Sequence, residues 1–270
     1  VRAALENVVD PVTVSMTSGY KIWSGNELLK ADFPPTEWLL KPYLPTPTLA
    51  LIAGAPKVGK SWIAMEFGLQ VAEAGYGTLY IASEDNEQRF QSRLRRLRPF
   101  AVSPEFKVLP MLSSEKALPQ GVAALDLITN FVTENPNLRC VIIDTVAAIR
   151  NPSEREKNYE VTSTEFGNLR QLAHNLGIAI VVVHHNRKST GMETSPIEMI
   201  LGSTGISATV ETIMVLQRQK GTQDINMLLT GKDIEEQELT FKWTAQGYQA
   251  AGVSVEAALG DTQRAVLNVI

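Results

Sequence analysis

Leu49–Ser61 reads LALIAGAPKVGKS and joins an apolar run of strand length to a glycine-rich turn. The turn, Gly54–Ser61, fits the P-loop pattern G-x-x-x-x-G-K-[ST] at every fixed position. The next residues place Ile63, Phe67 and Val71 on one face of a predicted helix. A strand, a glycine turn and a helix in this order form the context in which the pattern binds phosphate. We therefore predict a nucleotide site rather than an accidental glycine-rich turn.

The residue types in this turn have separate physical roles. Gly54 and Gly59 can adopt positive φ, which allows main-chain N–H groups to close around phosphate oxygens. The positive end of the helix dipole points at the same anion. Lys60 is expected to reach the β- and γ-phosphates, Ser61 to ligate Mg²⁺, and Trp62 to add a main-chain N–H. The predicted binding segment is Gly54, Ala55, Pro56, Lys57, Val58, Gly59, Lys60, Ser61 and Trp62.

Length and composition limit the possible classes of protein. With 270 residues, 44% of them hydrophobic, the chain can bury one full-sized core. Its net charge of −4 means that DNA binding would need a local basic patch. The arginine-rich stretch 89–98 is interpreted as a solvated or subunit-facing helix. The single cysteine, Cys140, is typical of a reducing cytoplasm, and no apolar stretch approaches the roughly 18 residues of a membrane span.

Apolar runs of strand length alternate with amphipathic helical patterns along the middle of the chain. Because these runs are continuous, both faces of their sheet should be buried, as in parallel sheets covered by helices. Two later segments, Asp224–Thr230 and Glu238–Trp243, are typical of an antiparallel pair. We predict an α/β fold with a mostly parallel twisted sheet, helices on both faces and this late antiparallel pair. The other predicted strands are 49–53, 77–82, 106–109, 138–143, 178–183 and 212–216.

The apolar run at 138–143 ends in Asp144, which is the pattern of a Walker B element. The strand would place this carboxylate at the carboxyl edge of the sheet, where a P-loop nucleotide binds. An acid after an apolar strand is common by itself, but here it follows an upstream P-loop. We therefore predict that Ser61 and Asp144 hold Mg²⁺.

Further polar phrases follow the predicted strands. They are Ser-Glu-Asp at 83–85, His-His at 184–185, Gly-Ser-Thr at 202–204 and Gly-Lys-Asp at 231–233. With the P-loop and Asp144, this set resembles the RecA-like P-loop ATPases over about Trp38–Gln249. The branch that it resembles most is that of the hexameric replicative helicases of plasmids and phages, typified by RepA, with more distant kinship to DnaB-type and RadA-type proteins. The resemblance implies a RecA-like fold, ATP and Mg²⁺ as ligands, and a homo-oligomeric, hexameric ring.

The resemblance also implies catalytic roles. Glu84 would be the general base that orients and deprotonates the attacking water, and removing such a base costs about 10²–10⁴-fold in rate. The alternative is an ordinary strand-end acid near a helix cap provided by Asp85 or Asn86. His184 or His185 would be the sensor that hydrogen-bonds the γ-phosphate. The alternative for either histidine is a partly buried structural role.

In relatives, a basic-x-Arg phrase on the penultimate strand reaches the γ-phosphate bound by the neighbouring subunit. The matching phrase here is Thr230-Gly231-Lys232, in which the first basic position is lost and lysine replaces arginine. Lysine is a point charge rather than a bidentate fork, which weakens the assignment of Lys232 as this trans finger. Arg218 and Lys220 are the alternative candidates.

The segment Arg187–Leu201 corresponds to the loop with which such rings grip single-stranded DNA. Arg187 and Lys188 are the predicted phosphate contacts. Glu193 and Glu198 offset their charge, and the segment lacks the aromatic residues of a strong stacking platform. DNA binding therefore has the least support of these expectations.

Three segments are predicted: an N-terminal arm at 1–36, a RecA-like ATPase domain at 37–249, and residues 250–270 as a linker and the start of a C-terminal helix or truncated domain. The arm is expected to pack either on a neighbouring subunit or on its own domain. The chain begins with Val1 rather than Met, which is expected of a fragment or a trimmed chain.

The predicted function is that of an ATP-hydrolysing, ring-forming DNA motor, a replicative helicase of a plasmid or phage. Single-stranded DNA and other replication proteins would be its partners. One alternative is a RecA- or RadA-like regulatory or recombination-mediator ATPase, which the acidic composition favours slightly. Another is a nucleotide-gated scaffold with little hydrolysis. A kinase is disfavoured because no acceptor-binding lid is evident after the P-loop.

Overall fold

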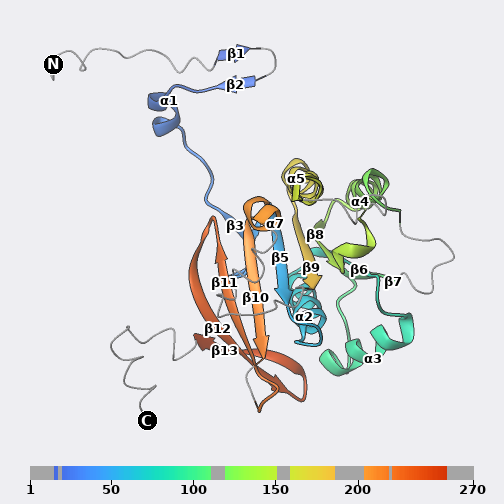
Figure 1. The fold of residues 1–270 in the computed structure, drawn as a ribbon. Helices are drawn as coiled ribbons and strands as arrows, with labels where there is room; N and C mark the ends of the chain where they lie inside the picture. The colour runs from blue at the N-terminus through green and yellow to red at the C-terminus, as the bar shows by residue number, and fades with distance from the viewer. Residues whose placement is uncertain are drawn as a thin grey trace, which may run out of the picture. The chain divides into compact units, whose positions relative to one another are not determined.

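A nine-stranded sheet forms the centre of the larger of two units in this computed structural model (Figure 1). The structure describes residues 15–17, 20–110, 119–150, 159–185, 204–218 and 221–253. Contacts within the chain group it into Val1–Thr36 and Glu37–Ile270, and each unit is described by itself. None of the helices in the described ranges is both long and apolar enough to cross a membrane.

The strands of the central sheet are β5 Thr48–Gly54, β6 Gly77–Ala82, β7 Phe106–Pro110, β8 Leu138–Asp144, β9 Ala179–His185, β10 Thr212–Arg218, β11 Ile225–Gly231, β12 Ile234–Thr244 and β13 Gly247–Val253. Their order is β13-β12-β11-β10-β5-β9-β8-β6-β7. Neighbours from β10 to β7 are parallel, and β11, β12 and β13 extend the β10 edge in antiparallel fashion. The predicted α/β fold is confirmed, with one more late antiparallel strand than expected.

The P-loop strand β5 lies between β10 and β9 and is buried along its whole length. Leu49 and Leu51 face one hydrophobic cluster, whereas Ala50 and Ile52 face the other. Because successive side chains point to opposite faces and both faces are covered, the strand is apolar at every position from 49 to 53. Each fully buried leucine or isoleucine contributes about 1.5–3 kcal/mol of hydrophobic stabilisation. The fold thus fixes where the P-loop begins.

Helices cover both faces of the sheet (Figure 1). They are α2 Lys60–Glu73, α3 Glu87–Leu97, α4 Val122–Glu134, α5 Tyr159–Leu176 and the short α7 Thr204–Thr209. Side chains of α2 and α3 belong to one core cluster, and those of α4, α5 and α7 to the other. The short 3-10 turn η2, Val146–Ala148, follows β8. Asn86 begins α3 because its side chain accepts a hydrogen bond of 2.9 Å from the N–H of Arg89.

The predicted linker at 250–260 begins too early. Strand β13 continues to Val253, because it pairs with β12 at Phe241–Ala250 and again at Leu239–Val253. Strands lacking strict alternation are hard to separate from linkers by sequence alone. The expectations for residues 254–270 lie outside the described residues.

Two smaller strand pairs precede the P-loop strand. In the larger unit, β3 Glu37–Leu40 and β4 Leu44–Thr46 are antiparallel and form the extended approach that the prolines predicted. In the N-terminal unit, β1 Ser15–Thr17 pairs with β2 Tyr20–Ile22, followed by α1 Gly25–Lys30. Ser24 and Glu27 form a capping box at the start of α1, which explains the short helix expected there.

Candidate nucleotide site

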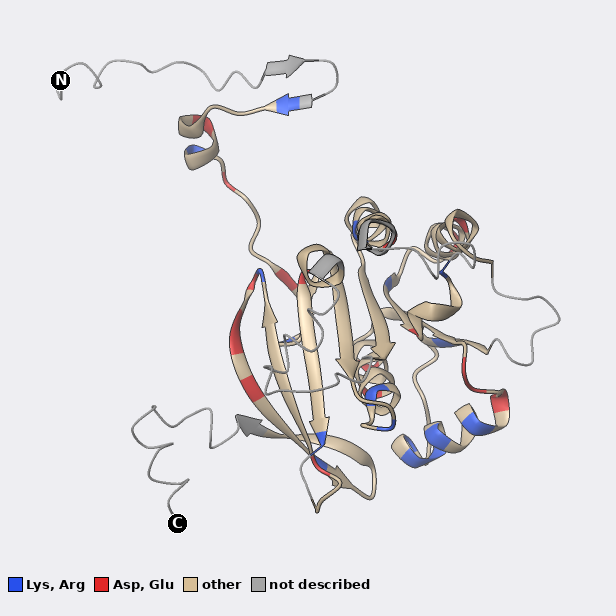
Figure 2. Ribbon diagram, in the orientation of Figure 1, with Lys and Arg blue, Asp and Glu red and all other residues tan. Residues whose placement is uncertain are grey.

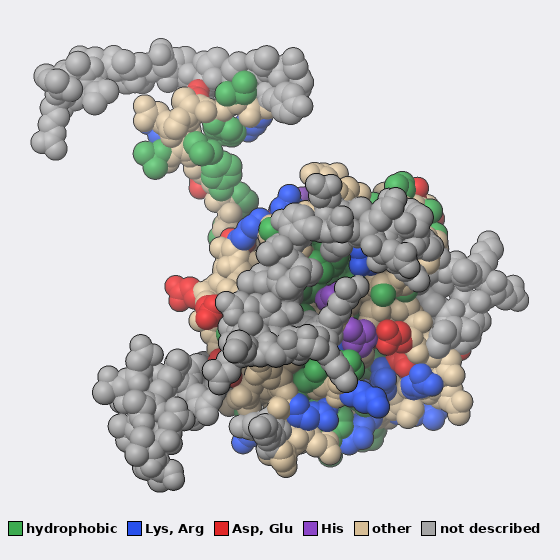
Figure 3. Space-filling view, in the orientation of Figure 1, with side chains coloured by type: hydrophobic (Ala, Val, Ile, Leu, Met, Phe, Trp, Pro, Cys, Tyr) green, Lys and Arg blue, Asp and Glu red, His purple; other side chains and the backbone are tan. Residues whose placement is uncertain are grey.

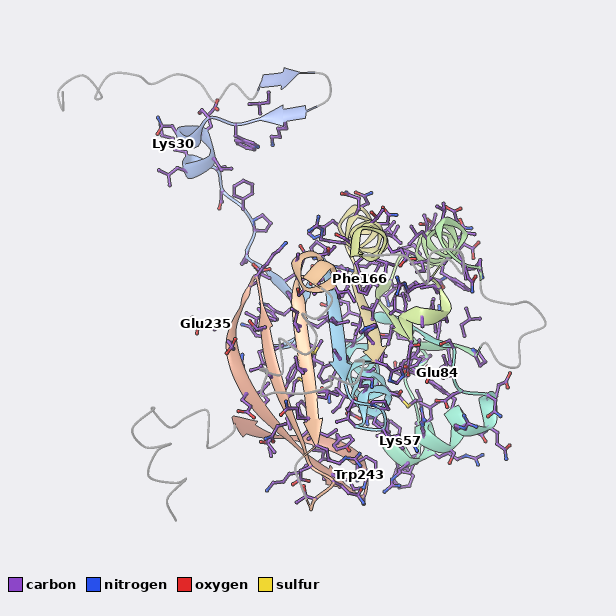
Figure 4. All side chains as sticks on the ribbon, viewed as in Figure 1. Lys30, Lys57, Glu84, Phe166, Glu235 and Trp243 are labelled. Atoms are coloured by element: carbon purple, nitrogen blue, oxygen red, sulfur yellow. The ribbon has the colours of Figure 1, made fainter. Side chains whose placement is uncertain are left out.

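The carboxyl ends of the parallel strands border a cleft of about 410 Å³. Its floor is formed by the P-loop and the first turn of α2, from Lys57 to Trp62. Figure 4 shows Lys57, Glu84 and Trp243 at the end of the sheet where the parallel strands finish, and Phe166 and Glu235 away from it. The predicted phosphate-binding segment therefore lines a cavity of nucleotide size.

The glycines of the P-loop are required by conformation and by space. Gly59 has φ 117°, and a Cβ atom there would lie 2.6 Å from Ile225 Cδ1. A Cβ atom on Gly54 would lie 2.6 Å from the carbonyl oxygen of Leu216. Strands β10 and β11 thus approach the loop too closely for any side chain at these positions.

Lys60 spans the P-loop from beneath. Its Nζ donates hydrogen bonds of 2.9 Å to the carbonyl oxygens of Gly54 and Ala55, and the residue is only 4% exposed. Burial lowers the pKa of Lys60 to about 8, and the charges of Asp144 and Glu84 act in the opposite direction. The lysine therefore interacts electrostatically with both predicted acids, which places all three in one site.

The main-chain N–H of Trp62 does not lie as expected. It donates a hydrogen bond of 3.0 Å to the carbonyl oxygen of Gly59 within the first helical turn. The prediction that this group is available for phosphate is therefore wrong. Only the first N–H groups of a helix lack an acceptor inside it, and Trp62 already lies beyond that point. Its ring lines the cleft instead.

Asp144 is a buried carboxylate with one satisfied oxygen. The hydroxyl of Tyr80 donates a hydrogen bond of 2.6 Å to Asp144 Oδ2, whereas Oδ1 has no hydrogen-bond partner among the described residues. Burial raises the pKa of Asp144, and hydrogen bonds from Tyr80 and Ser61 counteract part of that rise. A buried polar atom without a partner is unusual and is explained by an ion that binds there.

The donor set suits Mg²⁺. Mg²⁺ in nucleotide sites is held by one or two protein oxygens together with substrate phosphates and water. Ser61 and Asp144 provide such a pair, in hydrogen-bonding distance of each other. The described residues contain no group of three His, Cys, Asp or Glu that could hold a metal ion alone, so an ion here would depend on the phosphates.

Glu84 follows β6 and faces the end of β8. Thr145 Oγ1 donates a hydrogen bond of 3.2 Å to Glu84 Oε1, and His185 Nε2 lies 3.5 Å from the same oxygen. The side chain of Glu84 is 57% exposed, so water can reach its carboxylate. The helix-capping role belongs to Asn86, and Asp85 forms ion pairs with arginines of α3. Glu84 therefore remains available for chemistry at the cleft.

The two histidines occupy different positions at the end of β9. His184 pairs in register with Ala53 and is half-buried, whereas His185 pairs with Gly54, is more exposed and lines the cleft. The space-filling view shows a histidine beside acidic side chains, with Lys and Arg side chains gathered next to them (Figure 3). The geometry therefore favours His185 over His184 as the group that faces a bound nucleotide.

Sequence reasoning missed the cleft's arginines and aromatic rings. Arg93 and Arg96 of α3 line the cleft, so the expectation of a solvated or subunit-facing helix is wrong for these two positions (Figure 2). The Arg96 guanidinium lies 4.5 Å from the ring centroid of Trp243 and 5.9 Å from that of Trp62. The i, i+3 spacing of the two arginines was the available signal, because it puts them on one helical face.

Arg218 lies against the P-loop of its own chain. Its Nη2 donates to the carbonyl oxygen of Val58 at 3.4 Å, and the residue lines the cleft. Because β10 is parallel to β5, its carboxyl end must lie beside the loop that follows β5. The hypothesis that Arg218 acts on a neighbouring subunit's nucleotide does not fit this position.

Lys232 lies at the other end of the sheet. It follows β11, which runs antiparallel to β10, and Gly231 pairs with Thr212 at the beginning of β10. Its Nζ is 3.4 Å from Glu211 Oε1 and the side chain is 57% exposed. Lys232 cannot reach its own P-loop from there. Lys220, Arg187 and Lys188 lie outside the described residues.

Comparison with known proteins gives one family and one fold. A family model described as an AAA domain matches residues 18–191, well over half of the chain. Among solved structures, the ATPase domain of another protein matches with a TM-score of 0.58 and 13% identity, over 74% of this chain and 84% of that chain. At this identity the likeness shows the fold alone, and the predicted RecA-like fold is confirmed. No protein with curated function matches significantly.

Proposed function

The chain belongs to the AAA domain family, and from this membership we propose that it is an ATP-hydrolysing, ring-forming DNA motor, a replicative helicase of a plasmid or phage. The convergence of Lys60, Asp144 and Glu84 on one cleft carries the ATPase part of the proposal. The position of Lys232, remote from its own P-loop, supports the ring.

The nucleotide would bind with its phosphates on the P-loop and its base between α3 and the β12–β13 hairpin. The N-terminus of α2 and the loop amides attract the phosphates, and Lys60 exchanges the carbonyls of Gly54 and Ala55 for phosphate oxygens. Trp62 and Trp243, whose ring centroids are 5.2 Å apart, offer apolar and π surface for the base. Arg96 extends this surface with its guanidinium plane.

Hydrolysis would proceed by in-line attack of water on the γ-phosphorus. Glu84 accepts a proton from the water as the new P–O bond forms, and the bond to the bridging oxygen breaks to leave ADP and phosphate. Thr145 orients Glu84, and His185, beside the same carboxylate, would respond to loss of the γ-phosphate. Mg²⁺ held by Ser61 and Asp144 would supply charge neutralisation to the phosphates.

Single-stranded DNA is expected to raise the steady-state ATPase rate severalfold, and the assembled protein should displace a strand from a forked duplex with ATP. Double substitution of Arg187 and Lys188 by Ala should weaken DNA binding. The slope of log K against log salt should then decrease by about 0.7 for each phosphate that the variant no longer neutralises. Absence of both stimulation and strand displacement would sink the motor proposal while leaving the ATPase intact.

Lys232→Ala is expected to abolish cooperativity in ATP hydrolysis while nearly retaining nucleotide affinity. The side chain is exposed, so loss of its pair with Glu211 should change stability little. Steady-state rates against ATP concentration should give a Hill coefficient near one, whereas the control Lys242→Ala, on β12, should behave as wild type.

Mixing Lys232→Ala with Lys60→Ala subunits tests trans action directly. Each mixed interface can combine an intact P-loop from one subunit with an intact Lys232 from the next. Activity should therefore reappear from two defective proteins. If no activity returns although mixed oligomers form, Lys232 does not act across the interface.

A second candidate, a regulatory or recombination-mediator ATPase, is favoured by the acidic outer strand β12. Glu235, Glu236 and Glu238 follow one another closely on this strand, and Figure 2 shows their acidic band. Such a surface repels DNA and suits a basic protein partner. This candidate predicts assembly on DNA with ATP turnover but no strand displacement.

A further inference from the structure

Tyr80 on β6 joins the two residues that are proposed to hold Mg²⁺. Its hydroxyl donates a hydrogen bond of 2.6 Å to Asp144 Oδ2 and lies 3.5 Å from the main-chain carbonyl oxygen of Ser61. The residue is only 1% exposed and is among the largest fully buried side chains. A buried hydroxyl needs one acceptor, and here it selects the carboxylate.

The bond divides the labour between the two carboxylate oxygens. Oδ2 is occupied by Tyr80, and Oδ1 is buried without a hydrogen-bond partner among the described residues. Without the tyrosine, the carboxylate could rotate about its terminal torsion, which is broad and roughly two-fold. The hydrogen bond therefore fixes which oxygen is presented to a cation.

The ring of Tyr80 is itself held in place. It packs against Phe90 of α3 at a centroid distance of 5.1 Å and against Phe106 of β7 at 6.2 Å. Strand pairing aligns Tyr80 with Ile142 and Ala82 with Asp144, so backbone register sets the distance between hydroxyl and carboxylate. Such rigid support is what a residue that orients a metal ligand requires.

We propose that Tyr80 is a positioning residue for Mg²⁺ binding, which acts by holding Asp144 Oδ2 so that Oδ1 faces the ion. The proposal rests on the proposed function, because it requires a Mg²⁺–nucleotide complex at this site. It assigns Tyr80 a role that neither the P-loop nor the Walker B pattern contains.

Tyr80→Phe removes one oxygen atom and retains the packed ring. Tyr43→Phe is the matched control, because Tyr43 belongs to the same hydrophobic cluster, is 8% exposed and stacks on Phe67 at 4.8 Å without contacting Asp144. Binding of a ribose-labelled fluorescent ATP is measured without Mg²⁺ and in a Mg²⁺ titration. Circular dichroism and thermal unfolding check that each variant is folded.

Tyr80→Phe should leave Mg²⁺-free nucleotide affinity unchanged and raise the half-saturating Mg²⁺ concentration about 10–100-fold, the usual cost of removing a partner of a metal ligand. Tyr43→Phe should match wild type. The proposal is overturned if Tyr80→Phe has the Mg²⁺ dependence of wild type, or if its Mg²⁺-free affinity falls equally. If wild type itself binds no nucleotide, the proposed function fails rather than this inference.

Combination with Asp144→Asn gives a second, independent readout. Once Asp144 no longer supports Mg²⁺ binding, removing the Tyr80 hydroxyl should cost no further Mg²⁺ affinity. The two substitutions should therefore be non-additive in a double-mutant cycle. Full additivity would mean that Tyr80 acts through another group, which contradicts the proposal.

Discussion

Lys60→Ala is expected to abolish ATP turnover, with a loss of at least about 10²–10³-fold, and to weaken triphosphate binding. The lysine donates hydrogen bonds to the P-loop carbonyls of Gly54 and Ala55, so its ammonium is already held where the phosphates bind. Loss of a preorganised charge aimed at the transferred phosphoryl group typically has this magnitude. The effect should exceed any change in the affinity for ADP, because the γ-phosphate carries the charge that Lys60 neutralises.

The fold should survive this substitution. Lys60 begins α2, where Ala is well tolerated, and its ammonium is buried at a cost that lowers its pKa to about 8. The two carbonyls that lose a donor border the cleft, so water can replace it, and the expected cost is about 1–2 kcal/mol.

Phosphate release and nucleotide titrations measure the effect, and thermal unfolding verifies the fold. Lys107→Ala, an exposed lysine on β7, is the matched control and should retain wild-type rates. Normal turnover in folded Lys60→Ala would show that the cleft is not the hydrolytic site.

Glu84→Gln is expected to reduce turnover about 10²–10⁴-fold with little change in nucleotide affinity. The substitution keeps the shape of the side chain and its hydrogen bond from Thr145, at 3.2 Å in the wild type, but removes the basic oxygen. Because the carboxylate is half-exposed and is not part of the phosphate cradle, ground-state binding should be retained. The variant should therefore trap ATP.

Single-turnover rates with labelled ATP separate binding from chemistry. Glu87→Gln, three residues later in the first turn of α3, is the matched control, since it removes the same charge outside the cleft. Unchanged turnover in Glu84→Gln would contradict the general-base assignment. A wild type that turns over as slowly as the variant would favour the nucleotide-gated scaffold.

The sequence predicted the P-loop and the sheet because both depend on local information. Eight consecutive residues contain the glycines, the lysine and the serine of the phosphate cradle. Continuous apolar runs such as 138–143 identify buried parallel strands, since each strand is covered on both faces. The strand ends then placed Glu84, Asp144 and His185 at one edge without any knowledge of their contacts.

The same local reasoning failed where a residue's role depends on its neighbours in space. Arginines of α3 looked like surface charge, because a helical pattern does not show that the β12–β13 hairpin packs beside that helix. The hairpin approaches so closely that a Cβ atom on Gly247 would lie 2.2 Å from Leu97 Cδ2. Arg218 was assigned to a neighbouring subunit because sequence does not show that β10 pairs with β5.

The sequence by itself thus determined the kind of site, a phosphate cradle at the end of a buried strand with acids at neighbouring strand ends. Only the tertiary structure decided which oxygen of Asp144 is left for a cation, which histidine faces the cleft and which rings border it. The physical reason is that hydrogen bonds such as the one between Tyr80 and Asp144 act over about 3 Å. Strand register, which joins segments distant in sequence, sets distances on that scale.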